Sequence, residues 1–191
     1  MHRRVFILFV AILGIAQAFP SKAETIKNVE LFGVPIMNAS RDQLRQVFEK
    51  NGIEVVREDN KYWVDTYNAS RVLDGATNLE VGYVSATGKF AYAEYTFPGF
   101  MDTQLVSKII NMVSTKYGRP SSQSGSYGLG EVTAKWNMGK GMEIVVSRGW
   151  PDTTTYLTYK DITAYGQMRA EINAEEKAKS LQKAKAQSNA F

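Results

Sequence analysis

The sequence predicts an α+β protein in which helices pack on one face of an antiparallel sheet. Two segments, residues 38–52 and 100–118, carry apolar residues at the spacing of a helix, and each is followed by runs whose apolar residues alternate with a period of two. Asn, Gly and Pro separate these runs, which is typical of turns between antiparallel strands. The order is a helix and then a sheet, twice over, and a third helical segment follows.

The first unit begins with a short strand expected around 29–34. After it, Asn38 or Ser40 is placed to cap a helix of about eleven residues, and Gly52 stands where a left-handed residue ends it. The apolar stripe of this helix consists of Leu44, Val47 and Phe48. Two hairpins are expected next, "IEVVRED" with "KYWVDTY" across a turn at Asp59, and "LEVGYVSA" with "KFAYAEYTF".

The second unit repeats this order. Asp102 or Thr103 can cap a helix that Gly118 and Pro120 end. Its apolar stripe consists of Leu105, Val106, Ile109, Ile110, Val113 and Tyr117. The segment "SSQSGSYGLG" has the composition of a flexible loop, and three strands are expected after it: "EVTAKWNM", "GMEIVVSRG" and "TTTYLTYKD".

The two units, residues 29–99 and 100–160, recur with a period near 66 residues when Gly52 is aligned with Gly118. Their sequences share little identity. An ancient duplication and two unrelated copies of a common arrangement therefore both remain open, because antiparallel sheets with helices on one face are widespread.

Residues 161–191 are predicted to form a C-terminal helix and polar tail. Tyr165, Met168 and Ile172 keep a helical stripe, after which Ala, Lys, Glu and Gln predominate. We expect a helix that docks by its first two turns and continues as a fraying, solvated tail. The alternative is a basic helix for a partner or a membrane, which would use the lysines between Lys177 and Lys185.

The N-terminal residues 1–23 have the order of a secretory signal peptide. Arg3 and Arg4 precede a short apolar run, and small residues allow cleavage after Ala23 or, as second choice, after Ala18. The expected mature chain is periplasmic, with an α+β domain over 24–160. Removal of the signal lowers the net charge from +4 to near +1, so nucleic-acid binding is not indicated, and no later apolar run is long enough to enter a membrane.

The residue inventory excludes most catalytic chemistry. The chain has no Cys, and its single His, His2, lies in the predicted signal peptide. A mature chain without imidazole or thiol lacks Ser-His and Cys-His nucleophilic sites and the usual zinc ligands. We therefore expect no enzyme activity, no catalytic residues, no metal site and no cofactor.

Aromatic residues in the predicted strands point instead to binding. Strict alternation places Phe90, Tyr92 and Glu94 on one face and Ala91, Ala93, Tyr95 and Phe97 on the other, so both faces carry rings. One face must pack under helices, and the second can hold a partner. The candidate binding residues are Trp63, Tyr83, Tyr92, Arg148 and Trp150. The alternative interpretation is structural, with the rings covering sheet edges or meeting the C-terminal helix and with Trp150 anchoring a turn.

A helix that ends in "KYGRP" and leads into antiparallel strands resembles the superfamily of the outer-membrane assembly lipoprotein BamE and the tandem-repeat beta-lactamase inhibitor protein. The resemblance covers about residues 29–160. It implies a non-catalytic domain that binds other proteins through a sheet face and loops. The lipidation Cys of the lipoprotein branch is missing, so anchoring of that kind is not implied, and no inhibitory residues can be carried over.

Together these observations predict an exported adaptor or inhibitor-like protein that binds another envelope or periplasmic protein through an aromatic sheet face and the loop from Arg148 to Asp152. The alternative is a periplasmic module for a small ligand or a cell-wall glycan, with Trp63, Trp136 or Trp150 stacking on sugars. The oligomeric state is left open.

Overall fold

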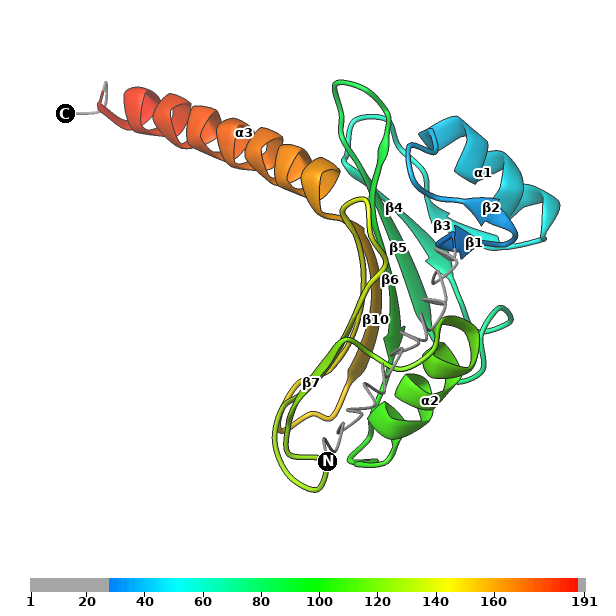
Figure 1. The fold of residues 1–191 in the computed structure, drawn as a ribbon. Helices are drawn as coiled ribbons and strands as arrows, with labels where there is room; N and C mark the ends of the chain where they lie inside the picture. The colour runs from blue at the N-terminus through cyan, green and yellow to red at the C-terminus, as the bar shows by residue number, and fades with distance from the viewer. Residues whose placement is uncertain (1–27, 189–191) are drawn as a thin grey trace, which may run out of the picture.

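The computed structural model describes residues 28–188, so the predicted signal peptide and its cleavage site lie outside the described residues. Within this range the α+β class is confirmed, with three helices, a large antiparallel sheet and a small one. Helices α1 and α2 lie on one side of the large sheet, and α3 leaves from the other side (Figure 1). The sheet is curved, and α1 and α2 cover its convex side (Figure 1).

The large sheet has eight strands in the order β3-β4-β5-β6-β10-β9-β8-β7, and every neighbouring pair is antiparallel. The first four strands are β3 (Glu54–Arg57), β4 (Val64–Asn68), β5 (Asn78–Tyr83) and β6 (Phe90–Phe97). The last four are β7 (Ser122–Gly125), β8 (Val132–Asn137), β9 (Met142–Arg148) and β10 (Thr155–Asp161). The two halves therefore form one continuous sheet, joined where β6 pairs with β10.

Strand β7 corrects the prediction of three strands in the second unit. Residues 122–125 lie in the segment expected as a flexible loop, yet they pair with β8 from Ser122 opposite Lys135 to Gly125 opposite Val132. All four residues of β7 are exposed, so the strand is an edge held by backbone hydrogen bonds rather than by apolar side chains.

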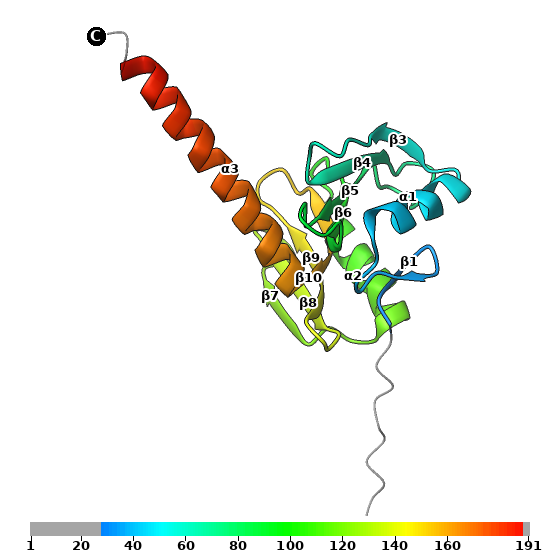
Figure 2. The ribbon, with the colours of Figure 1, turned by 90° about the horizontal axis from the view of Figure 1, so that it is seen from above.

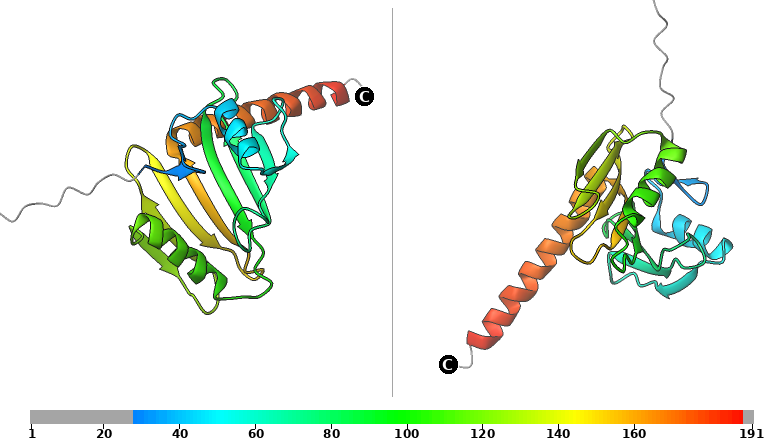
Figure 3. Two further views of the ribbon diagram at one scale, coloured as in Figure 1. Left: turned by 90° about the vertical axis from the view of Figure 1, so that its right-hand side faces the viewer. Right: turned by 90° about the horizontal axis from the view of Figure 1, so that it is seen from below.

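The N-terminal segment forms a hairpin in place of the single expected strand. Strands β1 (Glu30–Leu31) and β2 (Val34–Pro35) pair across Phe32 and Gly33, both of which have left-handed backbone conformations. The hairpin lies over the same face of the sheet as α1 and α2 (Figure 3).

Helix α1 (Arg41–Lys50) is capped by Ser40, one of the two predicted candidates, and not by Asn38. The Ser40 hydroxyl accepts from the Gln43 amide, the Gln43 side chain accepts from the Ser40 amide, and Gly52 is left-handed with φ +68°. Its stripe buries Leu44 and Phe48 against the sheet.

Helix α2 (Leu105–Tyr117) starts later than predicted. Neither Asp102 nor Thr103 is its cap, because the helix begins after Gln104 and has no side-chain cap hydrogen bond. The Asp102 carboxylate instead accepts from the Gln104 amide in the turn before the helix, at 2.8 Å. The expected stripe holds, since the helix buries Val106, Ile109, Ile110 and Val113.

A bulge in β6 corrects the predicted assignment of faces. Gly82 lies opposite Tyr92, but the next residue of β5, Tyr83, lies opposite Phe90, so Ala91 is the extra residue. Phe90 consequently joins the core under α1 and α2, while Ala91 packs on the other face. Strict alternation would have placed both residues on the wrong sides.

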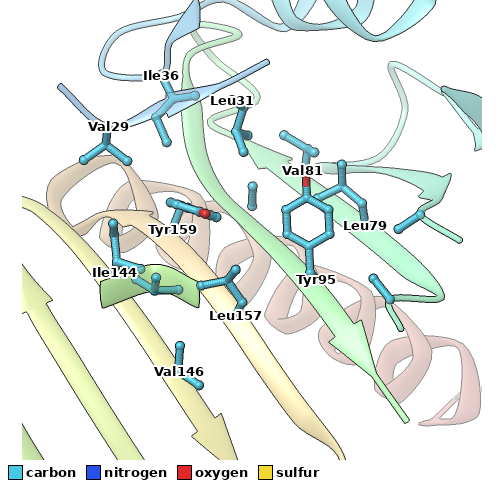
Figure 4. Close-up of a cluster of buried hydrophobic side chains, with 14 of the residues drawn as sticks. Val29, Leu31, Ile36, Leu79, Val81, Tyr95, Ile144, Val146, Leu157 and Tyr159 are labelled. Atoms are coloured by element: carbon cyan, nitrogen blue, oxygen red, sulfur yellow. The ribbon is translucent and has the colours of Figure 1, made fainter. Parts of the chain in front are cut away.

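The core fills the space between the sheet and the layer of α1, α2 and the β1–β2 hairpin. Figure 4 shows how side chains from the hairpin, such as Ile36 and Leu31, approach side chains from both halves of the sheet, such as Leu79 and Ile144. A single cluster thus spans both predicted units, which form one packed body.

Helix α3 (Ile162–Ser188) docks on the opposite face by its first turns and then projects away from the sheet (Figure 2). Ala164 and Met168 are buried against Val84 and Ala91. The carboxylate of Glu171 accepts three hydrogen bonds, from the Trp63 indole and from the amides of Ser85 and Ala86. From residue 173 to 188 every side chain is exposed, as expected for a solvated tail, and the segment is helical as far as Ser188.

An ion-pair network ties α1 to β4. Asp65 is completely buried, and its carboxylate accepts paired hydrogen bonds from Arg41 (2.6 and 3.0 Å) and from Arg45 (both 2.8 Å). Burial alone would raise the pKa of Asp65, but the hydrogen bonds from Arg45 and Arg41 outweigh it and lower the pKa below its ordinary value.

We predict that Asp65→Ala lowers the free energy of unfolding by about 3 kcal/mol, because two guanidinium groups lose their carboxylate. Urea unfolding at pH 7 measures this, with Asp74→Ala, an exposed Asp, as the control. Because the Asp65 pKa is lowered in the folded state, the stabilisation is complete above about pH 4 and is lost as the pH falls through the folded pKa. Equal stability of the two variants at pH 7 would contradict a structural role for the network.

Candidate binding surface

The five binding residues expected from the sequence lie in three different environments. Arg148 and Tyr83 are each only 1 % exposed, so neither side chain can contact a partner, and this corrects their assignment. Trp63 and Tyr92 are brought together beneath α3, in the cluster around Met168. Trp150 is 40 % exposed in the turn between β9 and β10 and does not belong to the cluster beneath α3.

Tyr83 lies on the core side of the sheet, where the Arg41 guanidinium sits 4.9 Å above its ring. Tyr92 lies on the opposite face because its strand position pairs with Gly82. Its ring meets Tyr165 of α3 edge to face at 5.5 Å, and its hydroxyl donates to Glu80 at 3.2 Å. The structural alternative, in which rings meet the C-terminal helix, therefore holds for Trp63 and Tyr92.

The tryptophans do not form a stacking cleft for sugars. Trp136 is buried and donates its indole N–H to the Gly118 carbonyl at 2.8 Å. Trp63 is held by Glu171 beneath α3, and Trp150 lies in the turn between β9 and β10, apart from the other two tryptophans. This arrangement gives the glycan-binding alternative no geometric support.

The buried Arg148 organises the loops at one end of the sheet. Its guanidinium donates five hydrogen bonds of 2.7–3.1 Å to backbone carbonyls, and the acceptors are Thr103, Ser126, Tyr127 and Gly130. These carbonyls belong to the loops 98–104 and 126–131, and Arg148 itself precedes the turn 149–154. We call these three segments together the loop end. Arg148 thus fixes a surface without being part of it.

The loop end exposes large apolar side chains. The exposed fractions are 88 % for Phe100, 65 % for Met101, 69 % for Leu129, 39 % for Tyr127 and 40 % for Trp150. Sequence reasoning named only Trp150. The sequence did contain a clue to Phe100 and Met101. Both lie after Pro98 and Gly99, which end the strand, and before the apolar stripe of the helix, so neither the strand nor the helix can bury them.

The backbone at the loop end is strained. Phe100 and Met101 have φ values of +44° and +71°, and Thr153 has +56°, in a region that side-chain-bearing residues rarely adopt. The Met101 amide donates to the Thr153 hydroxyl at 2.9 Å, which links the two strained segments. Strain of this kind, about 1–3 kcal/mol per residue, persists where the surroundings enforce it and is common at functional sites.

The concave face of the sheet runs from the docked part of α3 to the loop end and carries half-buried side chains. Along β6 these are Tyr92, Glu94 and Thr96, along β9 Glu143, Val145 and Ser147, and along β10 Tyr156 and Lys160. Figure 3 shows α1 and α2 together on the other face. Beyond α3, none of the described helices covers these residues.

Two carboxylates face each other in the middle of this surface. Glu80 of β5 and Glu94 of β6 are directly opposite cross-strand partners. Burial raises the pKa of Glu94, the hydrogen bond from Thr158 opposes this rise, and the charge of Glu80 adds to it. Like charges in this position destabilise a sheet, and the hydrogen bonds from Tyr92 to Glu80 and from Thr158 to Glu94, with the charge of Lys160, offset only part of this cost.

Residues 28–188 contain neither a metal-binding cluster nor a membrane-spanning helix. No three His, Cys, Asp or Glu side chains in this range are grouped so that they could hold a metal ion. No helix in the same range combines the length and apolarity that crossing a membrane requires.

Comparisons with known proteins give little further information. No protein-family model and no curated protein matches the chain. Among solved structures, the chain is similar to YjgB, a DUF4309 family protein from Bacillus subtilis, with 15% sequence identity and a TM-score of 0.40 over 67% of this chain and 82% of that one.

We predict that Arg148→Lys loosens the loop end, because an ammonium group cannot reproduce the planar fork that reaches four carbonyls. Hydrogen exchange at the amides of Met101, Ser126 and Gly149 should become roughly tenfold faster, which corresponds to the loss of one or two hydrogen bonds. Arg119→Lys, an exposed control, should leave these rates unchanged. Unaltered exchange in Arg148→Lys would show that the loops hold without this side chain.

Proposed function

We propose that this protein is an exported, non-catalytic protein-binding module that holds another exported protein through the loop end and the adjoining concave face. The observation that carries the proposal is the exposure of Phe100 and Met101 on strained backbone. Contiguous exposed apolar side chains mark interaction sites, and strain that keeps them exposed opposes folding stability. A partner that buries these side chains accounts for both features.

A protein fits this surface better than a membrane does. The three loops carry Asp102, Glu131 and Asp152 and no Lys or Arg. Surface helices and loops that enter anionic bilayers carry basic residues next to the apolar ones, because the headgroups repel carboxylates. The charge of the loop end therefore favours an apolar groove on a protein with a neutral or basic rim.

The carboxylate pair indicates what the partner offers to the concave face. Glu80 and Glu94 lie between the half-buried rings of Tyr92 and Tyr156, and the charges of Asp152 and Glu94 both raise the pKa of Tyr156 after the effect of burial. The charge of Lys160 acts on Glu94 more weakly than that of Glu80, so a lysine or arginine from the partner would relieve the remaining repulsion between the carboxylates and stack on a ring. We propose a partner with such a cation opposite the pair.

Two sequence features support export and binding as parts of the same role. Residues 1–23 have the pattern of a signal peptide. The absence of Cys and of any His beyond His2 removes the commonest catalytic side chains, which favours binding over catalysis. The superfamily that the "KYGRP" segment resembles also works by protein binding through a sheet face and loops.

The proposal is tested by photo-crosslinking in the native host. A benzoyl-phenylalanine at position 100 should crosslink one exported protein, and the same group at position 56, an exposed site on the edge strand β3, should not. With that partner purified, Phe100→Ser/Met101→Ser should weaken binding at least tenfold, since buried aromatic anchors commonly contribute more than about 1.4 kcal/mol.

The matched control is Val55→Ser/Val56→Ser, which removes two exposed apolar side chains from β3. It should bind the partner as the unaltered protein does. Equal affinity of the loop-end variant and the control would contradict the proposal. If position 100 crosslinks to lipid and the protein cosediments with phosphatidylglycerol vesicles, the proposal of a protein partner is contradicted and the loop end binds a membrane.

A further inference from the structure

The convex side of the protein contains a cavity that the proposed binding surface does not use. It has a volume of about 270 Å³ and lies between the β1–β2 hairpin and α2, above the junction of β6 and β10. Ligand pockets begin at about 300 Å³, so the cavity suits a compact molecule. Most of its lining is apolar and includes Leu31, Phe32, Leu73 and Val113.

Three tyrosines supply the polar groups of this cavity. Tyr95 comes from β6, Tyr159 from β10 and Tyr117 from the end of α2. Figure 4 shows the rings of Tyr95 and Tyr159 with their oxygens on the side of Leu31, toward the hairpin. The strands that join the two halves thus each direct a phenol group toward the side of the sheet that the hairpin covers.

These hydroxyls lack partners within residues 28–188. The Tyr117 hydroxyl is buried and has no hydrogen-bond partner, and no described residue makes a hydrogen bond to the hydroxyl of Tyr95 or Tyr159. Buried hydroxyls are normally paired, because an unpaired one loses its hydration without compensation. Of the three, the Tyr117 hydroxyl is the fully buried one, while the hydroxyls of Tyr95 and Tyr159 are free to donate to a molecule in the cavity.

The hydroxyls of Tyr159 and Tyr95 remain hydrogen-bond donors at physiological pH. Burial raises the pKa of Tyr159, and the neighbouring Tyr117 and Tyr95 raise it further. Burial raises the pKa of Tyr95 as well. The only charged residues of the lining are Glu30 and Lys116, one of each sign. A neutral ligand therefore loses less hydration here than a charged one.

We propose that this cavity binds a compact, uncharged and mostly apolar molecule whose acceptor oxygen receives a hydrogen bond from the Tyr159 hydroxyl. Aryl ketones belong to this chemical class. The apolar walls would hold the ring system, and the phenol group of Tyr159 would orient the oxygen.

The test compares two probes of nearly equal size, 2-acetylnaphthalene and 2-ethylnaphthalene, which differ in the acceptor oxygen. Titration of the folded, signal-free protein is followed by amide chemical shifts in NMR spectra. The ketone should bind about fivefold more tightly than the hydrocarbon, as expected for one net hydrogen bond. The shifts should centre on Leu31, Leu73 and Val113.

Tyr159→Phe keeps the ring and removes the hydroxyl, so it should abolish the preference for the ketone and leave hydrocarbon binding unchanged. The control Tyr156→Phe lies on the concave face and should keep the preference. Absence of binding by either probe, equal affinity of both probes for the unaltered protein, or shifts confined to another surface would each overturn the proposal.

Discussion

The pairing of β6 with β10 is the interaction on which the rest of the structure depends. Six consecutive residue pairs, from Thr155 opposite Phe97 to Lys160 opposite Tyr92, join the two halves into one sheet. Because side chains alternate across the sheet, the same two strands send Tyr95 and Leu157 into the core and Glu94 to the concave face. Helices α1 and α2 and the hairpin cover the convex side, where the tyrosine cavity lies. The concave side stays largely uncovered and forms part of the proposed binding surface.

Stability and recognition place opposite demands on this arrangement. Three features stabilise the fold: the ion pairs of Asp65, the shared core, and the hydrogen bonds that the Glu171 carboxylate of α3 accepts. The paired carboxylates of the concave face and the strained, exposed Phe100 lower the stability. Natural proteins often retain such locally unfavourable features where they serve binding. The features that oppose folding here lie on the surface that α1 and α2 leave uncovered and on the loops beside it.

Hydrophobic periodicity was enough to predict the class, α1 with its Ser40 cap, the stripe of α2 and most strands, because each of these depends on local sequence. Edge strand β7 was missed, since its Ser and Gly residues carry no apolar alternation and only backbone pairing holds it. The bulge at Ala91 has no local signal either. Arg148 was expected at the surface because it stands near Trp150 in a tight loop, but its side chain is buried and its acceptors come from loops as far as 45 residues away in sequence. The loop end and the tyrosine cavity depend on such distant contacts.

The central claim is that the concave face is kept for recognition at the expense of stability, and the variant Glu94→Gln tests it most directly. The amide side chain keeps an acceptor for the Thr158 hydroxyl, removes the repulsion from Glu80 and gives up the weaker attraction to Lys160. Urea unfolding at pH 7 should show that the variant is more stable than the unaltered protein by about 0.5 kcal/mol. A loss of stability would contradict the account, because it would show that the Glu94 carboxylate serves the fold itself.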